Sequence, residues 1–389
     1  MDAAARTNYS EFVVTRPLTD IPVPFVDLSH VHAALKDGFL ESVASVVDTG
    51  AFVNGPAVVE FERDYAAYCG SRLCVGVASG LDAIRLALLA AGIEPGDGVI
   101  VPANTFIATF EAVTQAGGAP VVVDVSESDY NLDVAAVEAA ITERTRFILP
   151  VHLYGQLADM RALGPIAARH GLAVVEDAAQ AHGAERDGAR AGSTGTAGAF
   201  SFYPTKNLGA LGDAGALVTD DDELAAKVRA LREHGQRVKY RHEAVGYTAR
   251  LDTIQAAALR LKLPLLDGWT EERRAAARVY DEALHGVGDL TLPPVPAGSE
   301  PVWHLYVVRT ADPSALAASL AEHRVASGRH YPEPAHLSEA YASLGYARGA
   351  FPVTERLADE LISLPLFPGI TQEQLAAVVD CVKEYFDRG

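Results

Sequence analysis

The feature that most constrains the fold of this chain is a repeated alternation of short apolar runs with longer stretches of helical periodicity. Strands that alternate with helices build a mostly parallel sheet, because each parallel connection crosses back over the sheet as a helix. The sequence therefore predicts an α/β fold with helices flanking the sheet. The predicted strands span residues 99–103, 120–125, 147–155 and 172–178, and the predicted helices span residues 81–92, 106–118, 132–143 and 160–171.

The second half of the chain continues this pattern and then departs from it. Predicted strands at 197–202 and 215–220 are separated by a glycine-rich loop and followed by helical stretches at 222–235 and 251–263. Beyond LPLLDGW, helical stretches mix with one strand pattern at 302–310. A chain of 389 residues can hold one large domain and a smaller companion. The predicted parts are an N-terminal arm (1–20), a large α/β domain (21–264) and a small C-terminal α+β domain (265–389).

The composition argues against several classes of protein. The formal net charge is -19 and no basic patch is interleaved with aromatic residues, so a nucleic-acid partner is not expected. No apolar run reaches the roughly 18 residues of a membrane span, and the N-terminus lacks the apolar core of a secretory signal. We therefore expect a cytoplasmic protein without membrane contact. Cys69, Cys74 and Cys381 show neither CxxC spacing nor neighbouring histidines, so we predict neither a metal site nor disulfides.

One lysine stands in an unusual setting. Lys206 lies in FSFYPTKNLGALGDAGALVTD (200–220), on the loop between two predicted strands and among small residues. A lone loop lysine is ordinarily a solvated cation, but a partly desolvated lysine amine forms a Schiff base with a carbonyl cofactor. The cofactor pyridoxal 5'-phosphate (PLP) also requires an acid near its ring nitrogen, a flat surface for its ring and donors for its phosphate.

Residues of each required kind occur near the ends of predicted elements. Asp177 ends the run LAVVEDA, at the carboxyl end of a parallel strand, where open α/β sheets bind their ligands. Each candidate also has an ordinary explanation: Asp177 as a helix cap, Ser79 as an N-cap and Phe106 as a core aromatic residue. The candidate contacts are Asp177 for the ring nitrogen, Gln180 for the phenolic oxygen, Phe106 for the ring face, and Ser79, Gly80, Leu81 and Ser201 for the phosphate.

Ordered motifs across the chain resemble those of one protein family. VVEDAAQAHGA, AFSFYPTKNLGALGDAGALVTD, ASGLDAIRLAL, VPANTFIAT and PVHLYGQ are similar to segments of the DegT/DnrJ/EryC1/StrS family of fold-type I PLP enzymes, the sugar aminotransferases. The resemblance runs from about residue 21 to the C-terminus and implies the aspartate-aminotransferase-like fold. It also implies that Lys206 is the Schiff-base lysine and proton shuttle, that Asp177 is the pyridinium partner, and that the remaining candidates hold the cofactor.

The same resemblance implies a reaction and an assembly. The reaction is amino transfer from L-glutamate to a nucleotide-activated keto-sugar, expected to be a dTDP-linked keto-deoxysugar with its carbonyl at C3 or C4. The cofactor would alternate between PLP and pyridoxamine 5'-phosphate. Family active sites are shared by two subunits, so a homodimer is implied. Where the family often has an Asn that contacts the partner's cofactor phosphate, this chain has Thr248, whose contact would be either water-mediated or missing.

Candidate sugar contacts are less specific. The segment 234–247 carries several cationic side chains and is the candidate diphosphate-binding loop, although a solvated basic loop would look the same. A structural role is the alternative for each histidine. The candidates are Arg237, Lys239, Tyr240 and His242 in that segment, His152 and Tyr154 in HLYG, His182 in AQAHG and His330 in RHYPEPAH.

Rival functions fit the sequence less well. A nicotinamide oxidoreductase would carry a GxGxxG turn and a P-loop hydrolase a Walker motif, and the chain has neither. The family's sugar dehydratases replace the lysine with histidine, whereas Lys206 is present here. A non-catalytic partner protein on the same fold is the other alternative, and it would be expected to lack Lys206 or Asp177.

Overall fold

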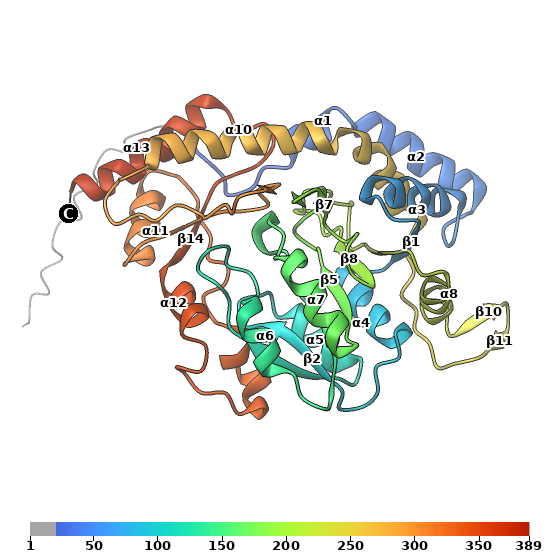
Figure 1. The fold of residues 1–389 in the computed structure, drawn as a ribbon. Helices are drawn as coiled ribbons and strands as arrows, with labels where there is room; N and C mark the ends of the chain where they lie inside the picture. Colours follow the sequence, from blue (N-terminus) through green and yellow to red (C-terminus); the bar gives the residue numbers. More distant parts are fainter. Residues whose placement is uncertain (1–20, 389) are drawn as a thin grey trace, which may run out of the picture.

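The centre of the molecule is a seven-stranded sheet, seen in the computed structural model that describes residues 21–388 (Figure 1). The strand order is β1-β9-β8-β5-β4-β2-β3. Strand β9 runs antiparallel to both of its neighbours, and the remaining pairs are parallel, so the predicted mostly parallel sheet is confirmed. The strands are β1 (Leu73–Val77), β2 (Gly98–Pro102), β3 (Ala119–Val123), β4 (Thr145–Ile148), β5 (Ala173–Asp177), β8 (Ala197–Ser201) and β9 (Gly215–Thr219).

Alternate residues of strand β2 face two different layers of helices. Along β2, Val99 and Val101 belong to the apolar cluster of one layer, whereas Ile100 belongs to that of the other. This alternation follows from the two-residue period of a strand, and burial on both faces explains why the strands read as continuous apolar runs. The first layer holds α4 (Gly80–Ala90), α5 (Ala108–Gln115) and α8 (Asp222–Leu231), and the second holds α6 (Val134–Ala140) and α7 (Met160–His170).

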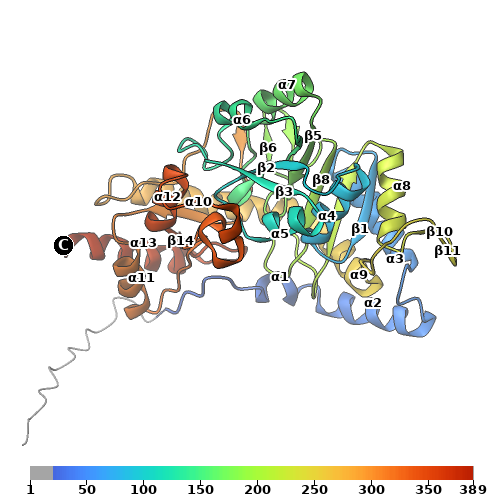
Figure 2. The ribbon, with the colours of Figure 1, turned by 90° about the horizontal axis from the view of Figure 1, so that it is seen from below.

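The C-terminal elements lie together at one side of the sheet (Figure 1, Figure 2). Strand β13 (Tyr306–Arg309) pairs antiparallel with β14 (Leu361–Leu364), which confirms a strand within residues 302–310. Helix α10 (Leu266–Leu284) follows the 3-10 turn η2 (Leu263–Leu265) without a break, so the domain boundary near residue 265 stays a prediction. The other elements here are α11 (Pro313–Glu322), η3 (Ala335–Leu337), η4 (Glu339–Leu344), α12 (Pro352–Glu360) and α13 (Gln372–Asp387).

The first part of the described chain forms elements for which the sequence pattern gave no prediction. Val23 bridges to Val325 and packs in the apolar cluster of the C-terminal elements. In α2, Leu40 and Val47 are 61% and 57% exposed, so the apolar residues of this helix do not mark one buried face. The arm predicted for residues 1–20 lies outside the described residues. The unpredicted helices are α1 (Ser29–Ala33), α2 (Lys36–Thr49) and α3 (Pro56–Cys69), whereas α9 (Thr253–Lys262) confirms the helical stretch predicted at 251–263.

Short strands form small sheets away from the centre. They include a hairpin that projects beside α8 at the edge of the molecule (Figure 1). Between residues 21 and 388, no helix is long and apolar enough to cross a lipid bilayer. The short strands are β6 (Glu185–Arg186), β7 (Ala189–Arg190) and β12 (Ser299–Glu300) in one sheet, and β10 (Gln236–Val238) and β11 (Arg241–His242) in the hairpin.

Candidate active site

One cavity of about 500 Å³ lies where strands β5 and β8 end and helix α4 begins. Asp177 is the last residue of β5, Ser201 is the last residue of β8 and Gly80 is the first residue of α4. The carboxyl ends of parallel strands meet at one edge of a sheet, which is why residues so far apart in sequence come together. Of the sequence candidates, Ser79, Gly80, Leu81, Phe106, Asp177, Gln180, Ser201, Lys206 and His330 line this cavity.

Lys206 reaches the cavity from the loop between β8 and β9. Its backbone N–H donates to the carbonyl of Tyr203 at 2.8 Å, which closes a tight turn. A side chain at Gly209 would lie 2.2 Å from the carbonyl oxygen of Pro204, so the turn needs the small residue there. Burial lowers the pKa of the Lys206 amine from 10.5 to about 8, and the carboxylate of Asp177 opposes this shift.

Asp177 is held by donors from two directions. The hydroxyl of Thr109 donates to Oδ2 at 2.8 Å, and the N–H of Ala179 donates to Oδ1 at 3.2 Å. Burial raises the pKa of this carboxyl, while these two donors and the cation of Lys206 lower it. The carboxylate therefore stands in a cavity where a further positive partner would stabilise its charged form.

The N-terminus of α4 forms one wall of the cavity. The hydroxyl of Ser79 accepts the N–H of Asp82 at 3.0 Å, so this side chain is an ordinary N-cap. The first N–H groups of a helix have no intrahelical acceptor, which leaves those of Gly80 and Leu81 for a ligand. A side chain at Gly80 would lie 2.6 Å from Cβ of Ser201, so only glycine lets the two elements approach this closely.

Gln180 has its amide oriented by the surrounding backbone. Its oxygen accepts the N–H of Tyr154 at 2.6 Å, and its nitrogen donates to the hydroxyl of Tyr331 at 3.2 Å. The second proton of that nitrogen is left for an acceptor such as a phenolic oxygen. The Tyr154 hydroxyl donates to the carbonyl of His330, so Tyr154 supports this wall of the cavity without lining it.

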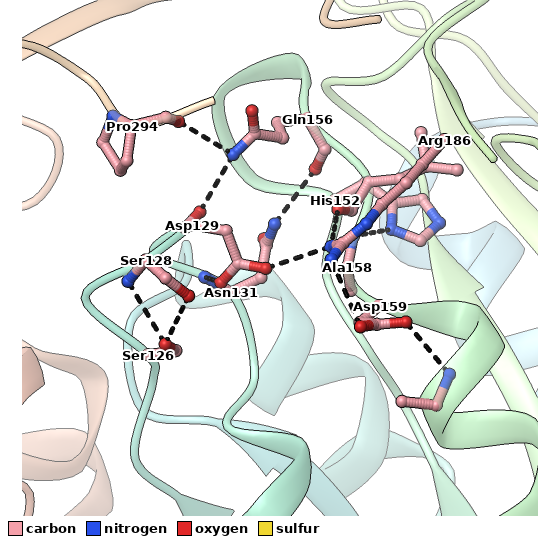
Figure 3. A network of polar contacts seen from close by, with 12 residues as sticks. Ser126, Ser128, Asp129, Asn131, His152, Gln156, Ala158, Asp159, Arg186 and Pro294 are labelled. Carbon is pink, nitrogen blue, oxygen red and sulfur yellow. Dashed lines mark hydrogen bonds and ion pairs between the residues drawn. The ribbon is translucent and has the colours of Figure 1, made fainter. Parts of the chain in front are cut away.

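Tyr154 lies in a turn beside a polar network that includes Asn131 and Gln156, and Figure 3 shows these two residues. Asn131 accepts the N–H of Leu153 at 3.1 Å and donates to the carbonyl of Gln156 at 3.2 Å. The amide of Gln156 in turn donates to the carbonyl of Pro294 at 3.2 Å. These bonds hold Tyr154 at a φ of 59°, a left-handed conformation that side chains rarely adopt.

His152 corrects one of the sequence expectations. Its ring is fully enclosed, its Nε2 lies 2.8 Å from Glu176, and its Nδ1 accepts the N–H of Ala158 at 3.2 Å. Figure 3 shows His152 at the border of the same network. We therefore assign His152 a structural role instead of the expected sugar contact. His182 is likewise enclosed, with Nε2 at 2.9 Å from the carbonyl of Ser201.

The candidates of segment 234–247 lie outside the cavity of their own chain. Arg237, Lys239, Tyr240 and His242 belong to the β10–β11 hairpin, where Tyr240 is 80% exposed. Thr248 lies outside the cavity as well, with its hydroxyl 3.1 Å from Nε2 of His234. Within one chain, the hairpin and Thr248 are therefore not brought to the predicted cofactor residues.

Several cavity residues were not among the sequence candidates. Thr109 comes from α5, three residues after Phe106 in the motif VPANTFIAT, so its position in that motif was a signal. Tyr331 follows the candidate His330, and its ring lies 5.4 Å from that of Phe106. His304 lies in the strand pattern VWHLYVVRT, which reads as apolar core and gave no signal.

Comparisons with known proteins show which family this chain resembles. The model of the DegT/DnrJ/EryC1/StrS aminotransferase family matches residues 34–383. A dTDP-3-amino-3,4,6-trideoxy-alpha-D-glucose transaminase from Streptomyces venezuelae is 47% identical over 366 residues, which cover 94% of this chain and 97% of the relative.

Solved structures agree with this match. The crystal structure of S. venezuelae DesV in complex with a ketimine intermediate has a TM-score of 0.93 and 47% identity, covering 95% of this chain and 99% of that one. The structure of ntda from Bacillus subtilis with bound cofactor PMP has a TM-score of 0.87 and 31% identity, covering 96% and 87%. The family is PLP-dependent, and this chain belongs to the DegT/DnrJ/EryC1/StrS aminotransferase family.

Proposed function

We propose that this chain transfers an amino group from L-glutamate to the keto carbon, at C3 or C4, of a dTDP-linked keto-deoxysugar. The observation that carries the proposal is that Lys206, Asp177 and the N-terminus of α4 line one cavity. An amine, a carboxylate and a helix N-terminus are the groups that hold the aldehyde carbon, the ring nitrogen and the phosphate of PLP. The activity named for the S. venezuelae relative supports the choice of nucleotide and sugar.

The residues of the cavity fit PLP in charge and in space. Asp177 would pair with the protonated ring nitrogen, which supplies a further positive partner for its buried carboxylate. The N–H groups at Gly80 and the hydroxyl of Ser201 would meet the phosphate. In the first turn of α4, Asp82 forms an ion pair with Arg85, so the negative charge of Asp82 is balanced. When bound, PLP draws electrons away from the carbon that carries the transferred nitrogen.

Lys206 would serve as both the attachment point of PLP and the base that moves the proton. A proton shuttle must stand beside the reacting carbon with a pKa near the working pH, and burial brings the pKa of Lys206 to about 8. The amine lines the same cavity as Asp177, whose carboxylate would orient the ring.

The lowered pKa predicts how PLP capture depends on pH. Only the neutral amine attacks an aldehyde, and Lys206 loses its proton around pH 8, where an ordinary lysine would need pH 10.5. The rate at which PLP-free protein binds PLP covalently is therefore expected to rise through pH 8 and then level off. Stopped-flow absorbance of PLP attachment across pH 6 to about 10 measures this rate. A rate that still climbs steeply above about pH 9.5 would place Lys206 in an ordinary solvated setting.

In the proposed homodimer, the hairpin and Thr248 of one subunit would approach the cavity of the other subunit. Both lie on the surface of the single chain, and the hairpin with the residues that follow it exposes Val238, Tyr240 and Val245, of which Val245 is 92% exposed. A homodimer with shared active sites would cover these apolar side chains and carry the hairpin cations toward the partner's cavity. The hairpin would then meet the diphosphate of the nucleotide sugar.

Removing the hairpin cations is expected to weaken sugar binding selectively. In the double variant Arg237→Gln with Lys239→Gln, KM for the nucleotide sugar should rise about tenfold, while KM for L-glutamate stays unchanged. Steady-state kinetics with each substrate varied in turn measure both constants. The matched control is Arg348→Gln with Lys227→Gln, which removes the same charge from exposed sites elsewhere. An equal change in the two double variants would reduce the hairpin to solvated surface.

Isotope transfer tests the proposed function itself. The purified protein with PLP and L-glutamate labelled with nitrogen-15 is incubated with dTDP-linked 3-keto and 4-keto deoxysugars in separate reactions. We expect mass spectrometry to find the heavy nitrogen in an amino sugar from one of them. Labelled alanine or aspartate as the better donor would correct the donor, and no labelled sugar with any keto substrate would overturn the proposal.

A further inference from the structure

Asn207, the residue after Lys206, fixes the tautomer of a histidine in the same cavity. The amide nitrogen of Asn207 donates to the carbonyl of Val302 at 2.8 Å, so its oxygen is the atom that faces His304. That oxygen lies 3.1 Å from Nδ1 of His304 and can only accept a proton. The proton of the neutral imidazole is therefore on Nδ1, and Nε2 carries a lone pair.

The ring of His304 stays neutral beside Lys206. Its pKa lies well below 6.5, chiefly because the ring is buried and then because the cation of Lys206 is near. Arg273 donates to the carbonyl of Trp303 at 3.2 Å, which anchors the backbone next to the ring. A neutral ring with one proton, already used toward Asn207, can act only as an acceptor at its other nitrogen.

The free nitrogen of His304 is neither hydrogen-bonded nor sealed from solvent in the described part of the chain. His304 lines the cavity together with Lys206, and Nε2 has no hydrogen-bond partner among residues 21–388. This nitrogen is not a buried atom without a partner, in contrast to Nδ1 of His182, which is enclosed and has no hydrogen-bond partner. The described part of the chain thus presents one unused acceptor close to the amine that would move the proton.

We propose that His304 is a specificity-determining residue whose Nε2 accepts a hydrogen bond from a sugar hydroxyl next to the reacting carbon. The proposal rests on the proposed function. L-Glutamate brings carboxylates, which are acceptors and would be repelled by a lone pair, and its amine is the group consumed at the reacting centre. A sugar brings hydroxyl donors on the carbons beside the carbonyl. His304 therefore discriminates in the sugar half of the reaction and leaves the glutamate half alone.

Two substitutions separate the acceptor from the contact to Asn207. The amide of an asparagine side chain lies where Nδ1 lies, and that of a glutamine lies where Nε2 lies. His304→Asn therefore keeps a donor toward Asn207 and loses the cavity acceptor, whereas His304→Gln keeps an acceptor in the cavity and loses the Asn207 contact. A structural role predicts that His304→Gln is the more impaired variant, whereas a sugar-binding role predicts that His304→Asn is the more impaired variant.

The test follows the two half-reactions by absorbance on the PLP-loaded protein. The sugar probes are dTDP-3-amino-3,4,6-trideoxy-alpha-D-glucose, the product of the S. venezuelae relative, and its counterpart that keeps the C4 hydroxyl. We expect His304→Asn to lower kcat/KM for an amino sugar about tenfold or more, with His304→Gln close to wild type and the L-glutamate half-reaction unchanged in both. Loss with the C4-hydroxy sugar alone assigns the C4 hydroxyl, and loss with both sugars assigns the C2 hydroxyl.

A binding measurement removes the chemistry from the comparison. Calorimetric titration of the amino sugars into PLP-free protein should show weaker binding, that is a higher Kd, for His304→Asn than for wild type or His304→Gln. A defect in His304→Gln with normal His304→Asn, or equal losses in both half-reactions, would overturn the proposal in favour of a structural histidine. A wild-type protein that reacts with neither 3-amino sugar would instead exclude C3 as the aminated carbon of the proposed function, and the same variants would then be compared on the corresponding 4-amino sugar.

Discussion

Replacing Lys206 by alanine is expected to lower amino transfer by about 10⁴-fold or more, because one side chain supplies both the attachment point and the proton shuttle. No other described lysine lines the cavity, so none can take over either role. The variant should still bind PLP weakly through the N-terminus of α4 and Asp177, but without the visible band of lysine-bound PLP. Product formation over hours and the absorbance spectrum measure the two effects.

Lys227→Ala is the matched control for this variant. Lys227 lies on the surface of α8 and pairs with Glu223 at 3.0 Å, so its loss should leave both turnover and spectrum as in the wild type. Transamination by Lys206→Ala at even one tenth of the wild-type rate would remove Lys206 from the chemistry and leave the cavity as a binding site only.

Replacing Asp177 by asparagine is expected to have the second largest effect. The neutral amide no longer keeps the ring nitrogen of PLP protonated, so PLP withdraws electrons less well from the reacting carbon. We expect the rate to fall by about 10²- to 10³-fold, the scale found for other preorganised electrostatic contacts. The hydroxyl of Thr109 can still donate to the amide oxygen, so the side chain should keep its place.

Single-turnover rates with L-glutamate measure the effect of Asp177→Asn apart from sugar binding. Thermal unfolding serves as the check on folding, because the substitution changes a buried side chain and could alter the stability of the protein as well as its activity. A stable variant that turns over nearly as fast as wild type would show that the ring nitrogen is not held by Asp177.

The parts of the site that could be predicted from sequence are those fixed by local pattern. Asp177 ends an apolar run and Gly80 begins a helical one, and both patterns place a residue at the same edge of the sheet. Lys206 stood out through its glycine-rich loop. These residues do line one cavity, as the order of strands and helices suggested.

Other parts of the site depend on packing that no local pattern records. His304 and Tyr331 reach the cavity from the C-terminal elements, whose approach to the sheet is set by tertiary contacts. His152 lies close in sequence to Tyr154, but it turns toward Glu176 because a buried carboxylate needs a donor. Arg237 on the hairpin does not line this cavity in its own chain, and its proposed approach is to the cavity of a partner subunit. Sequence spacing could not give any of these outcomes.

An absorbance titration of the purified protein tests the central claim most directly. The spectrum is recorded with PLP bound, after addition of L-glutamate, and again after addition of each nucleotide keto-sugar. We predict a visible band of lysine-bound PLP that L-glutamate bleaches and that one keto-sugar restores. A protein that shows no such band with PLP added, or a band that L-glutamate leaves unchanged, would contradict the assignment of Lys206 and the amino transfer that rests on it.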